Sequence, residues 1–146
     1  MAESGVLVSQ VRSVKEMGSR HFVLIDAGFN DLMRPAMYGS YHHITALAGM
    51  AGISAPRRRS KPWWPGRCAN PGMSLPSRRG QSRDPPAAGG SAGDYLVLHD
   101  TGAYGASMSS NYNSRPLLPE VLFDGGKARL IRRRQTIQEL LALELI

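Results

Sequence analysis

The sequence has little cysteine and no long apolar run. Its single cysteine, Cys68, excludes an internal disulfide framework and offers no paired spacing of the kind that zinc sites use. No stretch approaches the ~20 apolar residues needed to cross a bilayer. The N-terminus, MAESGVLVSQ, lacks the basic-then-apolar order of a signal peptide. With 146 residues, the chain is expected to form one cytoplasmic domain without a metal centre or a membrane segment.

Acidic residues are scarce between Gly49 and Ala92. This segment carries eight Lys and Arg residues against one acid, whereas ten basic and ten acidic residues balance in the rest of the chain. The formal charge of +7 therefore belongs to one block, which also contains seven of the ten prolines and both tryptophans. Because the block has no sustained period of 2 or 3.6 residues, it is predicted to lack packed elements.

The remaining sequence predicts a mainly β fold with short helices. Apolar and β-branched runs predict strands, and the Asp124-Gly125-Gly126 turn predicts a hairpin between the last two. The expected strands are Gly5–Val14, His21–Ile25, Tyr41–Leu47, Asp94–His99, Leu117–Phe123 and Lys127–Arg133.

Two short helices are expected between and after these strands. Asp31 is a candidate N-cap for a turn of helix over Leu32–Tyr38, which Pro35 keeps short. Thr136 and Glu139 fit a capping box, and the leucines that follow give a C-terminal helix an apolar face.

The stretch Leu96–Pro116 is the most distinctive part of the chain. An apolar strand leads into the polar, Gly-containing loop Asp100-Thr101-Gly102-Ala103-Tyr104-Gly105. A strand that ends in such a loop commonly holds a polar side chain at the edge of a pocket, and Tyr104 is the candidate here. The alternative is a half-buried aromatic residue at a strand end.

Two long segments of the sequence resemble the C-terminal domain of the diaminopimelate decarboxylase family. The first is QVRSVKEMGSRHFVLIDAGFNDLMRPAMYGSYHHI, within Gly5–Leu47, and the second runs from GDYLVLHDTGAYGASMSSNYNSRP to the end of the chain, over Gly93–Ile146. The resemblance implies a β-sandwich or barrel-like domain of the alanine-racemase-like, pyridoxal-phosphate-dependent decarboxylases. Members of the diaminopimelate decarboxylase family are lyases that convert meso-diaminopimelate to lysine and CO₂ and work as homodimers.

The sequence departs from the family in two ways. Only Met1–Ser4 precede the matching segment, so the N-terminal (β/α)₈ barrel of ~250 residues is expected to be absent. No lysine here matches the family's cofactor-binding lysine, and the Gly-Pro-Leu-Cys-Glu-Ser-Gly-Asp motif is missing. The chain is therefore expected to be an inactive fragment, divided into residues 1–48 and 93–146 of the domain and an intervening block, 49–92.

A changed reading frame accounts for the missing motif. Lys61–Leu75 reads KPWWPGRCANPGMSL. With permitted codons, the same bases read one position earlier give ETVVAGPLCESGDVF, which contains the motif. The consecutive Trp63 and Trp64 codons require a valine codon between them in that frame. Block 49–92 is therefore expected to be translated out of frame and disordered.

The resemblance assigns three residues to a binding site. Tyr104 is expected to reach the phosphate of pyridoxal 5′-phosphate, beside the substrate. Arg34 and Tyr38 are expected to bind the distal end of the substrate, and a guanidinium group suits two-point binding of a carboxylate. Their four-residue spacing places them on one face of a helical turn. The structural alternative for both is surface packing.

Other candidates are expected to have structural roles. Asp26 and Asn30 shape a loop, and His42, His43 and His99 show no metal-ligand spacing. Cys68 lies near the family's catalytic Cys-Glu pair, but its neighbours differ and the role is not carried over.

The basic block 49–92 suggests an alternative function. Clustered arginines around Trp63-Trp64 could bind phosphates and stack bases, which would make the chain a small β domain that binds nucleic acid or an acidic partner. The frame change explains the same residues and ranks higher. Arg132-Arg133-Arg134 is expected to be a solvated strand end.

Overall fold

The computed structural model describes residues 1–17, 20–49, 67–68 and 91–144. Most of block 49–92 lies outside the described residues. The disorder predicted for this block and its tryptophan-containing basic loop therefore stay predictions. The two segments that carry the family resemblance fold together into one β domain. Among the described residues, no helix is long and apolar enough to span a membrane.

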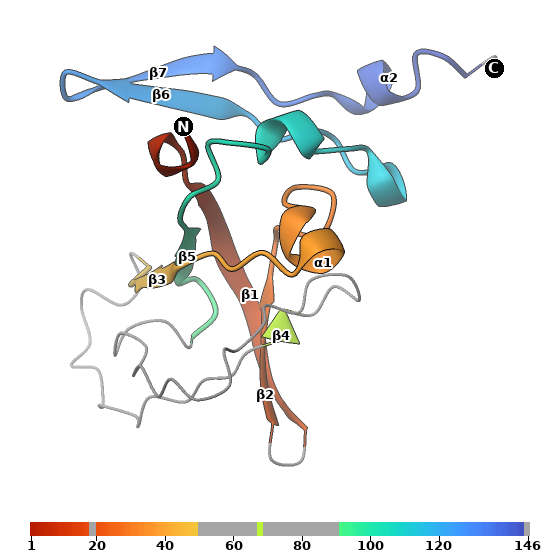
Figure 1. Ribbon diagram of the computed structural model, residues 1–146. Helices are drawn as coiled ribbons and strands as arrows, with labels where there is room; N and C mark the ends of the chain where they lie inside the picture. The colour runs from red at the N-terminus through yellow and green to blue at the C-terminus, as the bar shows by residue number, and fades with distance from the viewer. Residues whose placement is uncertain (18–19, 50–66, 69–90, 145–146) are drawn as a thin grey trace.

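A five-stranded sheet forms the body of the domain (Figure 1). Its strand order is β3-β5-β1-β2-β4, so the two resembling segments interleave within one sheet. β5 pairs antiparallel with both β1 and β3, whereas β4 pairs in parallel with β2. The strands are β1 (Leu7–Met17), β2 (Arg20–Ile25), β3 (Ile44–Leu47), β4 (Arg67–Cys68) and β5 (Tyr95–Leu98).

The predicted strands form with shifted ends. β1 starts later than expected and continues to Met17, paired with β2 through a register shift between Val11 and Ser13. β3 starts only at Ile44. β4 is a two-residue strand inside the block that was predicted to have no packed element, and it pairs with Phe22 and Val23. That prediction was wrong at this point, because pairing with a partner strand does not require a periodic pattern.

The core is small and lies against the sheet. Val11, Val23, Leu96 and Leu98 come from three neighbouring strands, and Leu32 packs against them from the segment before α1. Leu32 and Leu98 have 0% exposure. The connection between β2 and α1 is therefore anchored to the sheet by an apolar side chain.

Helix α1 (Arg34–Tyr38) is shorter than the predicted Leu32–Tyr38. Its N-cap residue is Met33 rather than Asp31, and the cap has no side-chain hydrogen bond. Asp31 instead accepts hydrogen bonds within its own loop, so the N-cap prediction was wrong. Pro35 lies in the first helical turn, where a missing N–H costs no hydrogen bond. The remaining short turns are the 3₁₀ segments η1 (Ala2–Ser4), η3 (Ala106–Met108) and η4 (Tyr112–Ser114).

A second, two-stranded sheet forms an arm at the upper end of Figure 1. The hairpin arm, defined here as residues 120–140, comprises β6 (Glu120–Asp124), β7 (Lys127–Arg132) and α2 (Ile137–Leu140). Gly125 and Gly126 have φ values of 54° and 75°, as a tight two-residue hairpin turn requires. The capping box between Thr136 and Glu139 forms as predicted, but α2 ends at Leu140, so the expected longer apolar helix face does not form.

Candidate functional site

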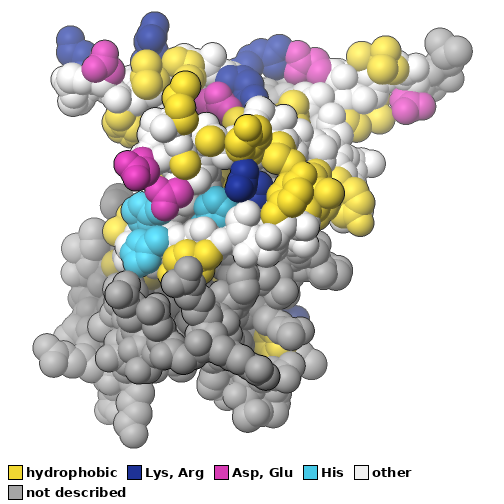
Figure 2. Space-filling model, in the orientation of Figure 1, with side chains coloured by type: hydrophobic (Ala, Val, Ile, Leu, Met, Phe, Trp, Pro, Cys, Tyr) yellow, Lys and Arg dark blue, Asp and Glu magenta, His cyan; other side chains and the backbone are white. Residues whose placement is uncertain are grey.

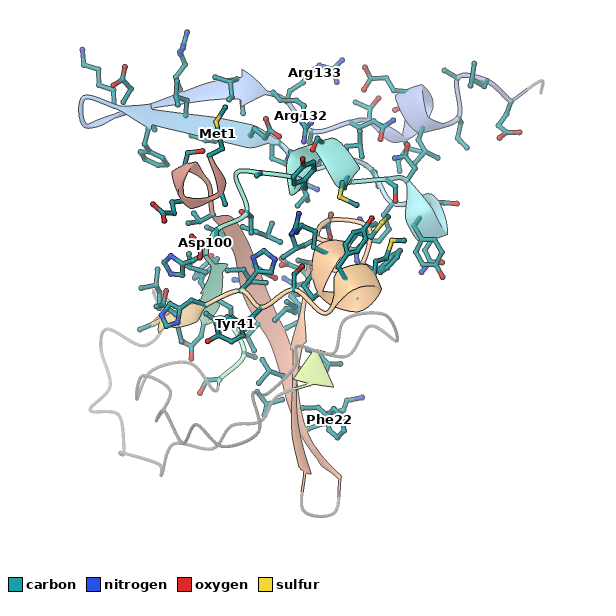
Figure 3. All side chains as sticks on the ribbon, viewed as in Figure 1. Met1, Phe22, Tyr41, Asp100, Arg132 and Arg133 are labelled. Atoms are coloured by element: carbon teal, nitrogen blue, oxygen red, sulfur yellow. The ribbon has the colours of Figure 1, made fainter. Side chains whose placement is uncertain are left out.

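The loop after β5 carries Tyr104 in an exposed position. Tyr104 has φ of 60° and Asp100, where the loop leaves the strand (Figure 3), has the same value. Left-handed backbone is unfavourable for a side chain with a Cβ, and such outliers collect at functional sites. The Tyr104 side chain is 59% exposed.

Two main-chain hydrogen bonds hold this loop against the start of the chain. The N–H of Thr101 donates to the Gly5 carbonyl at 3.0 Å, and the N–H of Gly102 donates to the Ala2 carbonyl at 2.9 Å. The contact is so close that a Cβ on Gly102 would lie 2.5 Å from the Met1 carbonyl oxygen. A Cβ on Gly105 would lie 2.2 Å from the Thr101 carbonyl oxygen. The glycines on both sides of Tyr104 therefore allow the loop to fold tightly.

The Arg34 guanidinium lies close to two aromatic rings. Its guanidinium carbon is 5.2 Å from the centroid of the Tyr104 ring and 6.0 Å from that of the Tyr38 ring. Arg34 and Tyr38 thus share a face of α1 as predicted, and the structure adds Tyr104 from a distant segment. The half-buried residue Arg34, close to two exposed tyrosines, combines a fixed positive charge with two phenol hydroxyls. This combination suits an anionic group such as a phosphate or a carboxylate.

Asp26 and Asn30 shape the preceding loop, as expected. One carboxylate oxygen of Asp26 accepts hydrogen bonds from the Ser9 hydroxyl at 2.7 Å and from the Gln10 N–H at 2.8 Å. Asn30 is buried, and its side-chain amide donates to Asp31. These contacts tie the loop to β1.

The histidines bridge β3, β5 and the residues next to them. Nδ1 of His42 lies 2.8 Å from the His99 carbonyl oxygen, and the His99 Nε2 lies 2.9 Å from the Thr45 hydroxyl. The rings of His43 and His99 are 5.3 Å apart. No group of three potential metal ligands occurs among the described residues.

Two arginines at the end of β7 form ion pairs. Arg132 lies 2.9 Å from Glu120 across the hairpin, and Arg133 forms a two-point pair with Glu139 (Figure 3 labels both arginines). The Arg133 guanidinium, followed by the Thr136 N–H, lowers the pKa of Glu139 to about 2. Glu139 is therefore ionised at any physiological pH.

Sequence reasoning did not single out Phe29 or Tyr112, and it assigned Asp31 a different role. The Phe29 and Tyr112 rings meet edge to face at 5.4 Å. Burial raises the pKa of Asp31, although the Gly28 N–H bond and the positive charges of Arg115 and Arg134 oppose the shift. A polar Asn30-Asp31 pair in the loop that follows the buried strand was the available signal for a buried loop network. The side chain of Cys68 lies outside the described residues.

Comparison with protein families matches residues 2–63 to the pyridoxal-dependent decarboxylase C-terminal sheet domain. Diaminopimelate decarboxylase of Escherichia coli strain K12 is 66% identical over 148 residues, and the match covers 100% of this chain and 35% of that protein. The chain thus spans about a third of the length of the curated relatives it matches.

Solved structures give the same relationship. A crystal structure of diaminopimelate decarboxylase matches with a TM-score of 0.77 and 66% identity, covering 99% of this chain and 35% of that chain. The diaminopimelate decarboxylase from M. jannaschii in co-complex with L-lysine matches with a TM-score of 0.76 and 33% identity, covering 99% of this chain and 31% of that chain.

Proposed function

We propose that the chain belongs to the pyridoxal-dependent decarboxylases and forms part of a diaminopimelate decarboxylase. In this proposal the whole enzyme converts meso-diaminopimelate to lysine and CO₂ in the cytoplasm. The described part of the chain contributes the edge of the site that binds the negatively charged ends of cofactor and substrate.

The observation that carries this proposal is the meeting of Arg34 and Tyr104. These residues lie far apart in the sequence, yet the guanidinium carbon is 5.2 Å from the Tyr104 ring centroid. The group fits pyridoxal 5′-phosphate and a dicarboxylic amino acid, since both present anionic groups to be bound. The described lysines, Lys15 and Lys127, lie in β1 and β7 and not in this group.

Each residue has a distinct proposed role. The Tyr104 hydroxyl donates a hydrogen bond to the cofactor phosphate from an exposed loop whose backbone is already set. Arg34 and the Tyr38 hydroxyl bind the distal carboxylate of the substrate. Pyridoxal phosphate, when bound, supplies the electron sink for loss of a carboxylate. The residues of this chain bind and orient the two anionic groups so that the reacting carboxylate faces the cofactor.

The other groups that the reaction needs are proposed to come from outside the described residues. We propose that the cofactor-binding lysine belongs to the part of the relatives that this chain does not span, and that the whole enzyme is a homodimer. The chain by itself is then inactive. A purified sample given pyridoxal phosphate and meso-diaminopimelate is expected to release no CO₂, and turnover would overturn this part of the proposal.

We also propose that residues 49–92 are read out of frame. The abrupt change to a basic, Pro-rich composition supports this, and the family match ends at residue 63, inside the block. Resequencing of the locus tests the proposal directly. The proposal is contradicted if the nucleotide sequence of the block has no insertion or deletion when it is aligned with the gene of the E. coli protein.

Binding of pyridoxal phosphate to the purified chain tests the site itself. ³¹P NMR titration reports the phosphate group, and we expect Tyr104→Phe and Arg34→Gln each to raise the Kd about tenfold or more, since each loses a hydrogen bond or a charge toward the anion. Tyr112→Phe is the matched control, because Tyr112 is similarly exposed but is not assigned to the anion. Equal affinities in all four proteins, or no binding by the unmodified chain, contradict the proposed site.

A further inference from the structure

The turn Phe29–Asp31 contacts the loop after Tyr104 at two points. The N–H of Ser110 donates to the Asn30 carbonyl oxygen at 2.9 Å. The rings of Phe29 and Tyr112 meet edge to face at 5.4 Å. A third tie comes from the same loop, because the Arg115 guanidinium donates to the Asp26 carbonyl oxygen at 2.7 Å. These contacts join the segment that leads into α1 to the segment that follows Tyr104.

The turn itself is held rigid by buried polar side chains. Asn30 and Asp31 are 2% and 6% exposed. The Asp31 carboxylate accepts from the Gly28 N–H at 2.7 Å with one oxygen and from the Asn30 side-chain amide at 2.8 Å with the other. Leu32 follows directly and is fully buried in the core. The turn is thus fixed to the sheet on one side and presents the Asn30 carbonyl to Ser110 on the other.

From these contacts we propose that Phe29, Asn30 and Asp31 are positioning residues that hold the Tyr104 loop against α1, so that Arg34 and Tyr104 together bind an anionic group. This inference rests on the proposed function for its purpose. It assigns to the turn a role that the sequence did not predict, since Asn30 was expected only to shape its own loop.

A purely structural role is distinguishable because the strand ladders use no main-chain group of this turn. The strand pairs β1–β2, β1–β5 and β3–β5 are formed by their own main-chain hydrogen bonds. The described contacts between the turn and residues 110–115 lie outside the sheet. Loosening them should therefore separate Arg34 from Tyr104 while the sheet remains folded.

The test uses the NMR signal of the Arg34 Nε–Hε group. A proton held over an aromatic ring is shifted upfield, and a Tyr104→Leu variant gives the reference value without the ring. We examine Phe29→Leu, which removes the ring contact, and Asp31→Asn, which replaces one of the two accepting oxygens by a donor. Glu139→Gln is the matched control, because it also neutralises a carboxylate that accepts a main-chain N–H, but in the hairpin arm.

We expect Phe29→Leu and Asp31→Asn each to reduce the ring-dependent shift by about half or more, and to raise the Kd for pyridoxal phosphate about tenfold. The amide signals of β1 and β5 should remain dispersed, and Glu139→Gln should leave both readouts unchanged. An undiminished Arg34 shift in the folded Phe29→Leu variant overturns the positioning role.

The outcomes separate this inference from the proposed function. If the shift falls in the two variants while the unmodified chain binds no pyridoxal phosphate, the turn positions Arg34 and Tyr104 but the assigned ligand is wrong. If the chain binds the cofactor and the shift does not fall, the site is correct and the positioning role is wrong.

Discussion

The five-stranded sheet and the hairpin arm use similar apolar residues in opposite ways. In the sheet, Leu98 and Val23 are 0% and 2% exposed. In the arm, Phe123 and Leu130 are 76% and 60% exposed although both lie in paired strands. Figure 2 shows hydrophobic side chains on the surface of this upper part of the molecule. Strand formation in the arm therefore does not depend on burial within the described part of the chain.

Local contacts shape the arm instead. The Gly125-Gly126 turn sets the register, Glu120 and Arg132 pair across the strands, and the Thr136–Glu139 capping box starts α2. All of these contacts join residues close in the sequence. The sheet, in contrast, needs β5 to pair with β1 and β3 from distant parts of the chain. The structure of the hairpin arm is therefore determined by contacts between residues close in the sequence. The structure of the five-stranded sheet is determined by long-range packing.

The largest effect is expected from Leu98→Ala in the core. Removal of this fully buried side chain leaves a cavity and should lower the free energy of unfolding by about 2–5 kcal/mol. Urea unfolding followed by circular dichroism measures the loss. The comparison variant Phe123→Ala in the arm should change stability by no more than about 0.5 kcal/mol. Similar losses in the two variants would show that the arm is packed in solution.

A pair of glycine substitutions sharpens the comparison at the level of the backbone. Gly105→Ala would place a Cβ 2.2 Å from the Thr101 carbonyl oxygen, so the loop must move, at a cost of about 1–3 kcal/mol. A Cβ at Gly125 would meet open space, so Gly125→Ala should lower the free energy of unfolding by only about 1 kcal/mol, because its φ of 54° is unfavourable for alanine. Thermal unfolding of both variants measures the difference. A smaller loss for Gly105→Ala contradicts the tight packing of the Tyr104 loop.

Loss of the helix cap should remain confined to the arm. In Thr136→Ala the Glu139 N–H loses the hydroxyl that accepts its hydrogen bond, and α2 should be destabilised by about 1 kcal/mol. Hydrogen exchange at the Glu139 amide should accelerate, while exchange in β5 stays unchanged. Thr136→Ser keeps the hydroxyl and is the control. Faster exchange in β5 would mean that arm and sheet unfold together.

The smallest expected effect is a loss of stability at low pH when Glu139 becomes protonated. The Arg133 guanidinium lowers the pKa of Glu139 to about 2 from an ordinary value of 4.5. The folded state therefore binds the proton less tightly, and this contribution to stability is present above pH 4.5 and lost as the pH falls through about 2. Carbon NMR titration of the Glu139 carboxyl group measures the shift. Arg133→Gln should return the pKa toward 4.5, and a normal pKa in the unmodified chain would contradict the ion pair.

Sequence patterns predicted the local features well. The hairpin turn follows from two consecutive glycines, and the capping box follows from the Thr136–Glu139 spacing, because each depends on a few neighbouring residues. The N-cap prediction for Asp31 was wrong, since an acidic residue before a helix can equally well serve its own loop. Its partners, Gly28 and Asn30, make it a buried acceptor instead.

Strand ends were predicted less accurately than strand positions. Tyr41–Leu47 has suitable residues throughout, yet β3 covers only Ile44–Leu47, while the His42 ring contacts the carbonyl of His99. Which residues join a ladder depends on where the partner strand begins and ends. That partner, β5, comes from beyond the basic block.

The sequence alone determined the family resemblance, the approximate positions of the strands other than β4, the hairpin and its turn, and the capping box, because each of these depends on residues that are close in the sequence. It also proposed Arg34, Tyr38 and Tyr104 one by one. Only the tertiary structure decided that Arg34 lies beside Tyr104 and that the Phe29–Asp31 turn joins their two segments. The physical reason is that this meeting depends on β5 pairing beside β1 and on a buried loop network, and no local pattern encodes either.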